Sequence, residues 1–489
     1  MGKKRNMAKD AAILTFVRCV TMLVSIIQTM ILTRTLSKTN YGTYSQAVLV
    51  VSLLSPFFSM GLENAINYFF NKSESIEIRK IYINTIFAIS LTAGLLCGLM
   101  IIILRMRIGL YFDNPLIVPL TGYIAFRPCL QNLIALYQPI YISSGYVKTI
   151  AIRNLFISLM QIIIVGGVSC FLNNISIVLC LLLLLDIFQL ICFAAIYRKR
   201  EFKISVLQSD FSLSGEILKY ALPMLFSLSV GTISANIDKL MISGLMSVED
   251  YALYSNVSKE LPFSFIAGSF TAVVTPFIVK YINNGENSKF KELWACYLEI
   301  GYRVTWPLCF AALVFSPELI EVLYSGLYLS REGIIVFRLY TITAMFRFTY
   351  FGIVPTAMGR TDIIMKYSVL GCMINLILNY PMYYIMGMPG PAFATIISMA
   401  VPSFLYFRAT AKLIQVHVLD VLVPKKIIIL ILKMLLGGIL SKVIVSIFNN
   451  IAVNVFFTLL MGCLIIFIVI FGTDYKTIKS LVKYMNKEG

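Results

Sequence analysis

The sequence predicts an all-α polytopic membrane protein with about fourteen transmembrane helices, in two parallel six-helix lobes followed by two C-terminal helices. The 489 residues are 59% hydrophobic and only 13% charged. Apolar runs of roughly 20 residues recur from Ala11 to Phe471, each long enough to cross a bilayer as a helix. Two short blocks also recur, which indicates an internal duplication. The alternative, a large soluble helical protein, requires polar helix faces that few segments have.

The apolar runs define the predicted spans in order. Several are longer than the hydrocarbon core requires, which predicts tilt or extension past the membrane surface. The fourteen spans cover 11–33, 43–70, 81–104, 116–143, 149–170, 175–197, 215–244, 252–281, 293–315, 333–358, 362–386, 390–414, 427–447 and 451–471.

Lys and Arg are distributed unequally between alternate loops. With the N-terminus inside, the inner loops hold 27 of them, whereas the outer loops hold five: Arg34, Lys38, Arg105, Arg107 and Arg331. Cytoplasmic loops are enriched in basic residues, so both termini are predicted to be cytoplasmic. This placement accounts for most of the net charge of +18, and no nucleic-acid partner is expected.

The repeated blocks divide the chain. The first pairs Leu36-Ser37, Tyr41 and Tyr44-Ser45 with Met246-Ser247, Tyr251 and Tyr254-Ser255, an offset of 210 residues. The second pairs Gly145 and Asn154 with Gly359 and Ser368, an offset of 214. Each copy holds six spans, an even number, so the two copies enter the membrane in the same orientation. Parallel repeats with a cavity between them are typical of alternating-access transporters.

We therefore expect an N-lobe (1–205, helices 1–6), a C-lobe (206–414, helices 7–12), helices 13 and 14 (415–474) and a basic cytoplasmic tail (475–489). Lysines at helical spacing predict that the tail is an interfacial helix on an anionic inner leaflet. A disordered basic tail is the alternative.

Three segments resemble the signatures of a known family. They read I-L-T-R-T-L-S-K-T-N-Y-G-T-Y-S-Q-A at 31–47, S-M-G-L-E-N-A at 59–65 and I-D-K-L-M-I…Y-A-L-Y-S at 237–255. These segments are similar to those of the O-antigen and polysaccharide flippases (Wzx-type). That family belongs to the MOP superfamily, which also holds the MATE multidrug antiporters and the lipid II flippase. Thr43, Ala252 and Glu63 depart from the usual pattern, and Glu63 puts a standard coupling mechanism in doubt.

The resemblance implies a MATE-like fold in a bacterial cytoplasmic membrane. It implies a flippase that moves undecaprenyl-diphosphate-linked oligosaccharide from the inner to the outer leaflet. The product would serve the synthesis of O-antigen (part of lipopolysaccharide), capsule or exopolysaccharide. The expected partners are this lipid-linked oligosaccharide, membrane lipids, a polysaccharide polymerase and glycosyltransferases, and the protein is expected to be a monomer. The alternatives are a MATE-like ion-coupled exporter of drugs or metabolites, a lipid II flippase and, as an enzyme, a membrane glycosyltransferase or polymerase.

Charged residues inside apolar segments are costly and usually functional. Four cations, Arg18, Lys239, Lys259 and Arg347, are predicted to line a cationic cavity that binds the diphosphate, because guanidinium groups match phosphate oxygens. A pocket for organic cations would instead be acidic. Arg34, Arg127 and Arg338 are candidate outer-side contacts, with a structural role as the alternative.

Three acidic residues, Glu63, Asp186 and Asp238, are candidates for proton or sodium coupling. Asp186 has no cation nearby in its own span, so its partner must come from another helix. For Asp238 the alternative is a structural ion pair with Lys239 between helices. Glu299 and Arg303, one turn apart, are assigned to each other as a structural pair. Lys433 and Lys442 lie outside the repeat and also receive a structural interpretation.

Other residues carry less information about chemistry. Aromatic side chains such as Tyr68, Tyr137, Tyr141 and Tyr350 are suited to stacking on sugar, with simple packing or interface anchoring as the alternative. The ten Cys include no C-x-x-C pair, and the one His is His417, so no metal site is predicted. The chain lacks the phosphate-binding loop of many ATPases, and no cofactor or catalytic residue is expected.

Overall fold

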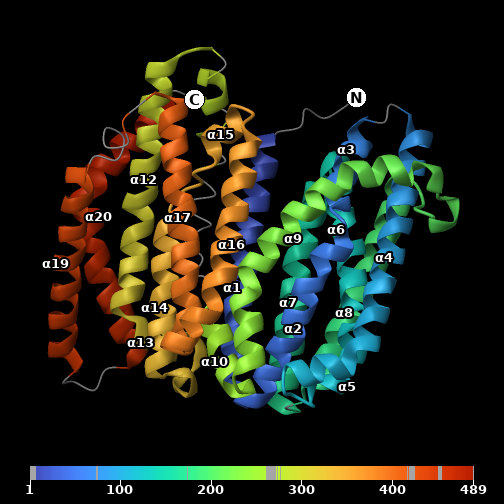
Figure 1. Cartoon of the computed structure of the whole chain (residues 1–489), viewed down its shortest axis with the longest axis horizontal. Coiled ribbons are helices and arrows are strands. Elements are labelled where there is room, and N and C mark those ends of the chain that lie inside the picture. Colours follow the sequence, from blue (N-terminus) through green and yellow to red (C-terminus); the bar gives the residue numbers. More distant parts are fainter. Residues whose placement is uncertain are drawn as a thin grey trace. The chain divides into compact units, whose positions relative to one another are not determined.

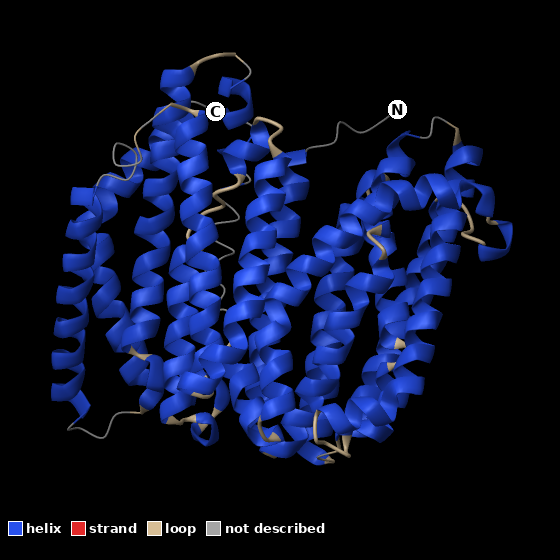
Figure 2. Cartoon of the chain, viewed as in Figure 1, coloured by secondary structure: helices blue, strands red, loops and turns tan. Residues whose placement is uncertain are grey.

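Helices are the only regular elements in the part of the chain that the structure describes (Figure 2). The structure is a computed structural model of the whole chain. It describes residues 7–72, 75–172, 174–259, 284–415, 424–449 and 454–487, together with 271, 274–275, 277–282 and 417. The predicted span 252–281 therefore lies partly outside the described residues. The all-helical fold class is confirmed.

Contacts divide the chain into two compact units, Met1–Leu253 and Tyr254–Gly489. In the first unit the helices are α1 (Met7–Thr35), α2 (Lys38–Ser59), α3 (Leu62–Lys72), α4 (Ile76–Tyr111), α5 (Ile117–Ile124), α6 (Arg127–Ser143), α7 (Val147–Phe171), α8 (Ile175–Arg200) and α9 (Ser214–Leu245) (Figure 1). Two short 3-10 turns, Val206–Gln208 and Phe211–Leu213, precede α9. Helix α9 packs against α2, α3 and α4.

Helix α10 (Val248–Val257) crosses the boundary between the units. In the second unit the described helices are α12 (Asn287–Val314), α13 (Ser316–Tyr324), α14 (Arg331–Phe346), α15 (Ile353–Ala357), α16 (Thr361–Met386), α17 (Pro389–Leu413), α19 (Pro424–Asn449) and α20 (Val455–Lys487). Helices α19 and α20 pack on each other and on α12. Helix α20 continues without a break through Lys487, so the tail is helical to that residue, as one of its two sequence interpretations predicted.

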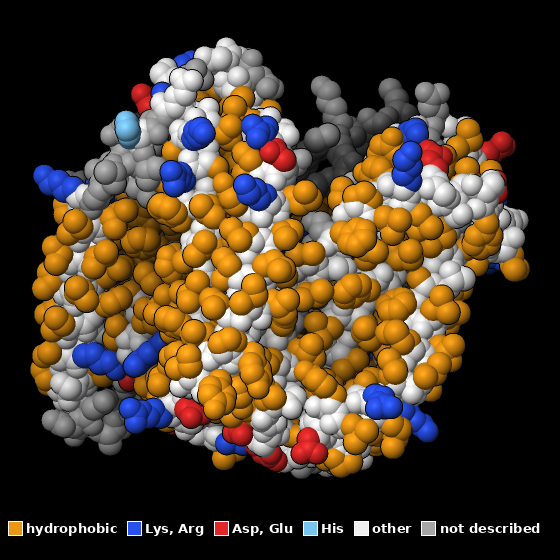
Figure 3. All heavy atoms as spheres, viewed as in Figure 1, with side chains coloured by type: hydrophobic (Ala, Val, Ile, Leu, Met, Phe, Trp, Pro, Cys, Tyr) orange, Lys and Arg blue, Asp and Glu red, His pale blue; other side chains and the backbone are white. Residues whose placement is uncertain are grey.

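Ten described helices or helix pairs are long and apolar enough to cross a membrane, and a bent pair, α12 with α13, makes an eleventh candidate. These candidates coincide with eleven of the fourteen predicted ranges. Large apolar side chains lie exposed along them, such as Ile103 on α4 and Ile439 on α19. On the face shown in Figure 3, hydrophobic side chains cover the middle of the helices, and charged side chains gather mostly toward their ends. That distribution suits lipid rather than water.

Three of the predicted spans contain a break between two helices. Residues 43–70 break into α2 and α3 where Met60 and Gly61 both take positive φ (53° and 67°). A side chain at Gly61 would meet the Ala221 carbonyl oxygen at 2.7 Å, so the break lets α9 approach closely. Ranges 116–143 and 333–358 likewise each form two helices. The hydropathy of a segment indicates how long its apolar run is, but it does not indicate where the helix bends.

The first repeated block adopts the same local structure in both copies. Ser37 caps α2 by accepting from the Asn40 N–H (3.2 Å), and Ser247 accepts from the Asp250 N–H (3.1 Å) at the start of α10. Each Ser side chain thus accepts a hydrogen bond from the N–H of the third residue of its helix, one of the amides that lack a partner within the helix. The first Tyr of each block, Tyr41 or Tyr251, is buried.

The second repeated block is also the same turn twice. Gly145 (φ 81°) and Gly359 (φ 69°) each end a helix in the left-handed conformation that glycine adopts without strain. The following N–H groups bond back alike, Tyr146 to the Tyr141 carbonyl and Arg360 to the Pro355 carbonyl, both at 2.8 Å. Helices α7 and α16 then begin at Val147 and Thr361, again 214 residues apart. The duplication predicted from the sequence is therefore present in the backbone.

Candidate functional site

The first unit contains a partly open polar cavity of about 370 Å³ among four of its helices. Helix α1 contributes Thr21, helix α6 two glutamines, helix α7 a polar face and helix α8 an Asp and a Gln. Its polar lining consists of Thr21, Gln131, Gln138, Arg153, Asn154, Ser158, Gln161, Asp186 and Gln189. Three of these helices pass the length and hydropathy test for a span. Polar groups within apolar spans usually face a wet cavity and serve function.

A chain of contacts links the charged groups at this cavity. The Arg127 Nε donates to Asp186 Oδ2 (3.1 Å), and both side chains are buried. The other oxygen of Asp186 accepts from Gln189 Nε2 (3.3 Å), and Gln189 Oε1 in turn accepts from Arg153. Arg153 also donates to Asn154 Oδ1 (2.7 Å). Two guanidinium groups face one carboxylate, so this cluster carries a positive surplus.

Part of the cavity's hydrogen-bonding capacity is unused. The Arg153 Nε is buried and has no hydrogen-bond partner among the described residues. Gln138 and Gln161 make no side-chain hydrogen bond to any residue that the structure describes. An unpaired buried donor costs free energy unless a water or a ligand satisfies it. The cavity can therefore bind a polar ligand through a guanidinium and several amides.

The four predicted cavity cations do not line this cavity. Arg18 lies on an exposed part of α1 and Lys239 is half-buried on α9, both in the first unit. In the second unit, Lys259 Nζ lies 3.3 Å from Asn256 Oδ1, and Arg347 ends α14. The four cations themselves stay predictions.

The predicted outer-side residues have varied surroundings. Arg34 donates to the Met30 carbonyl of its own helix (3.0 Å). Arg127 is committed to Asp186, as described above. Arg338 donates to Ser316 Oγ (2.7 Å) and, with Arg331, lines a separate pocket of about 510 Å³ in the second unit.

The acidic candidates are equally diverse. Glu63 is exposed in the first turn of α3, just after the Met60–Gly61 break. Asp238 is buried in α9. The sequence-based expectation that Asp186 needs a cation from another helix is confirmed, because Arg127 comes from α6 and Asp186 from α8. Among the described residues, no three His, Cys, Asp or Glu side chains are grouped to hold a metal ion.

Arg153 is the residue that sequence reasoning missed, since it counted as part of an inner loop. Helix α7 begins six residues earlier, and Arg153 lies in its second turn. The available signal was a helical face: Asn154, Ser158 and Gln161 follow at spacings of four and three residues. That face was hidden because the apolar residues between them dominate the hydropathy of the segment.

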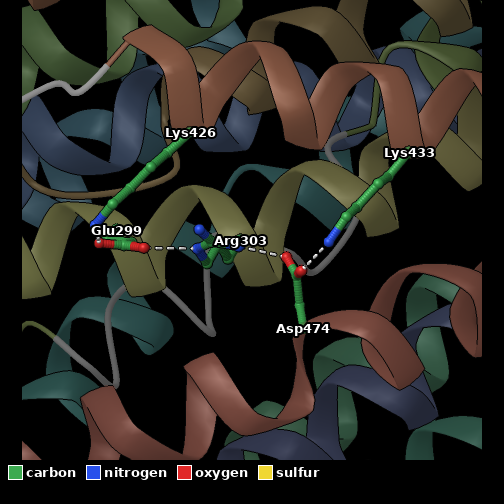
Figure 4. Close-up of polar contacts among 5 residues, drawn as sticks. All are labelled: Glu299, Arg303, Lys426, Lys433 and Asp474. Atoms are coloured by element: carbon green, nitrogen blue, oxygen red, sulfur yellow. Dashed lines mark hydrogen bonds and ion pairs between the residues drawn. The ribbon is translucent and has the colours of Figure 1, made fainter.

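A ladder of charges lies in the second unit (Figure 4). The Arg303 guanidinium on α12 contacts Glu299 of the same helix (2.9 Å) and Asp474 of α20. Two lysines of α19 extend the ladder: Lys426 pairs with Glu299 (2.7 Å) and Lys433 with Asp474 (2.5 Å). The predicted Glu299–Arg303 pair is confirmed, and the ladder fastens the two C-terminal helices to α12. Lys442, also interpreted as structural, pairs with Glu318 (3.0 Å).

Comparison with known structures identifies the fold. The lipid II flippase MurJ in an inward closed conformation superposes with a TM-score of 0.70 and 14% identity, covering 95% of this chain and 99% of that one. An inward-facing MATE family transporter of the MOP superfamily gives 0.62 and 13%, covering 82% and 98%. A MOP superfamily transporter from Pyrococcus furiosus gives 0.54 and 13%, covering 83% and 96%. A search of curated proteins finds no match.

The fold and the apolar helices thus define a multi-pass membrane protein with the MOP fold. A family model described as polysaccharide biosynthesis protein matches residues 31–331, more than half of the chain. The chain belongs to this polysaccharide biosynthesis protein family, as the resemblance of its signature segments indicated.

Proposed function

We propose that the protein is a flippase that moves undecaprenyl-diphosphate-linked oligosaccharide from the inner to the outer leaflet of a bacterial cytoplasmic membrane by alternating access. Membership of a polysaccharide biosynthesis family supports the class of cargo. The MOP fold and the duplicated backbone support the transport mechanism. The basic excess in alternate loops supports the orientation with both termini in the cytoplasm.

The observation that carries the proposal is the polar cavity of the first unit. Its Arg153 offers the planar fork that phosphate oxygens match, and each such charge-assisted hydrogen bond contributes roughly 1.5–3 kcal/mol. Its Gln and Asn amides both donate and accept, as the hydroxyl groups of a sugar require. A cavity with this lining suits a cargo that is anionic and polyhydroxylated.

The cavity also argues against the competing functions. An exporter of organic cations needs an acidic surplus, whereas Asp186 faces Arg127 and Arg153. A glycosyltransferase or polymerase needs acid–base groups aligned on an acceptor. Asp186 is held in an ion pair, and His417 is exposed. We therefore propose a transporter rather than an enzyme.

Energy for the step has a natural source in the membrane potential. A potential that is negative inside favours outward movement of a dianionic headgroup by about 4–5 kcal/mol per 100 mV. Exposed Glu63 and buried Asp238 are the proposed groups for any additional ion coupling. We propose that the protein acts as a monomer and receives its cargo from glycosyltransferases, with a polymerase using the product.

The test is transport in vesicles by site variants. Purified protein is reconstituted with a fluorescent undecaprenyl-diphosphate oligosaccharide, and its appearance in the opposite leaflet is followed. We expect Arg153→Ala to lower the rate by about tenfold or more, which is the loss of one charged hydrogen bond, and Arg153→Lys to retain part of it. Arg18→Ala and Arg347→Ala test the cations predicted from sequence.

Two results would refute parts of this proposal. Efflux of organic cations without any movement of the glycolipid would reject the flippase function. Glycolipid transport that Arg153→Ala leaves unchanged, in a variant with the wild-type melting temperature, would keep the function and reject this cavity as its site.

A further inference from the structure

A second polar pocket, of about 440 Å³, lies on the first unit between α3 and α9. Helix α3 buries Leu62, Ala65, Ile66, Phe69 and Phe70 in the core. Its opposite face, at helical spacing, carries Asn64, Asn67, Tyr68, Asn71 and Lys72. Helix α9 completes the pocket with Tyr220 and Met224. We call this pocket the asparagine–tyrosine groove.

Aromatic rings form one wall of the groove. Tyr68 and Tyr220 stack with ring centroids 4.4 Å apart and planes at 17°. Behind them, Phe69 stacks on Tyr82 at 4.6 Å, and Tyr82 donates to Glu216 Oε2 (2.7 Å). Tyr68 nevertheless remains 42% exposed. A rigid ring that is held by packing and still open to ligand is a platform for stacking.

Amide groups lie along the same face of α3. Asn71 Nδ2 donates to Asn67 Oδ1 (3.1 Å) and to the Asn67 carbonyl oxygen (2.7 Å), which orients both side chains. Asn64, one turn before, makes no side-chain hydrogen bond to any described residue. Its donor and acceptor are available to a ligand with hydroxyl groups.

Charge distinguishes the groove from a phosphate site. Lys72 pairs with Glu216 at 3.3 Å, and its Nζ lies 5.4 Å from the Tyr68 ring centroid. Lys72 is therefore neutralised, and the other polar lining residues that the structure describes are uncharged. An anionic headgroup would therefore gain little electrostatic attraction in the groove. An acyl chain would leave the Asn amides without hydrogen-bond partners.

We propose that the asparagine–tyrosine groove binds a sugar ring of the cargo. One C–H face of a pyranose lies on the Tyr68 ring, whose π face is negative, and Asn64 and Asn67 bond its hydroxyls. This inference rests on the proposed flippase function and adds a subsite that selects the saccharide. The groove residues Asn71 and Lys72 end α3, and Figure 1 shows α3 ending and α4 beginning at the same end of the first unit. That end holds Lys72, Arg79 and Lys80, so it faces the cytoplasm, where the cargo is loaded.

Helix α6 connects the groove with the polar cavity. Its last residue, Ser143, accepts from Asn71 Nδ2 (3.4 Å), and Gln138 of the same helix lines the cavity. Five residues of helix separate them by about 7.5 Å along the axis. An oligosaccharide of a few rings is long enough to contact both sites.

The test is saturation-transfer NMR on the full-length protein in nanodiscs, with methyl glycosides of glucose, galactose, rhamnose and N-acetylglucosamine as probes. We expect ring C–H signals for at least one glycoside. Tyr68→Ala should weaken that signal by about fivefold, because it removes the stacking surface, and Tyr68→Phe should retain it. Asn64→Ala should weaken it without touching the stacked rings. The control is Tyr384→Ala, at a tyrosine of α16 that is 84% exposed.

No signal from any glycoside, or a signal equal in wild type and Tyr68→Ala, would overturn the subsite. The vesicle assay separates this inference from the function it rests on. Glycolipid transport without Tyr68-dependent sugar binding would reject the proposed sugar subsite and leave the proposed flippase function standing. Tyr68-dependent binding of a glycoside without glycolipid transport would establish the groove and reject the flippase.

Discussion

Buried arginines in this protein differ in whether their polar atoms have hydrogen-bond or ion-pair partners, and this difference separates structural residues from candidate binding residues. Arg303 illustrates the point, because its guanidinium lies between two buried carboxylates, Glu299 and Asp474. Burial of such ions is costly, and the cluster persists because each carboxylate meets two cations. Arg153 differs in having a buried Nε with no described partner, and for that reason we assign it to ligand binding rather than to structure.

The first prediction concerns this ladder. Arg303→Met leaves Glu299 and Asp474 with one lysine each, and removal of one partner from a buried pair costs about 3–5 kcal/mol. We expect a clearly lower melting temperature in detergent, measured by intrinsic fluorescence. Arg360→Met is the matched control, because Arg360 pairs with Asp362 at 2.9 Å on the surface, and no shift is expected there. Equal melting temperatures for wild type and Arg303→Met would contradict the structural role.

At the scale of elements, the first signature segment is explained by a close helix contact. Gly42 on α2 lies against the start of α10, where an added Cβ would be 2.4 Å from the Val248 carbonyl oxygen. Thr39 Oγ1 donates to Glu249 Oε1 (2.5 Å) beside it. This hydrogen bond holds the pKa of Glu249 below its usual value, so its contribution to stability is present at neutral pH and is lost as the pH falls.

The second prediction follows from that contact. Gly42→Ala forces the backbone of α10 away from α2, and such overpacking costs about 1–3 kcal/mol. The expected result is a lower melting temperature and reduced transport. Gly122→Ala on α5 serves as the control, because the added Cβ would have no described neighbour within 4 Å beyond its own stretch of helix, and this variant should behave as wild type. A Gly42→Ala protein as stable as the control would show that α2 and α10 are not packed so closely.

Some structural features of the helices and their contacts could be predicted from the sequence, and others could not. The duplicated turns at Ser37 and Ser247 were found because caps are local, and a local pattern survives in the sequence. The need of Asp186 for a distant cation was also foreseen from the cost of burial. Arg127 was not identified as that cation, and Asp474 was not assigned to Arg303, because 171 residues separate them and only the fold brings them together. The break at Met60 was not predicted, because the hydropathy of a segment contains no information about its backbone angles.

For the molecule as a whole, the distribution of charge predicts the topology in the membrane. The basic excess in alternate loops predicts that both ends of the chain lie on the cytoplasmic side. A fluorescent protein that folds only in the cytoplasm, fused after Gly489, should fluoresce, whereas alkaline phosphatase at the same position should be inactive. Active phosphatase there would reverse the orientation and place the asparagine–tyrosine groove on the outer side.

The central claim is that the molecule moves a glycolipid between leaflets. The most direct measurement uses wild-type protein in vesicles that carry a fluorescent undecaprenyl-diphosphate oligosaccharide, with a fluorescent organic cation as a second cargo and an imposed potential. We predict that the oligosaccharide lipid changes leaflet, faster when its starting side is negative, and that the cation is not transported. Movement of the cation alone, with the glycolipid remaining in its original leaflet, would contradict this prediction.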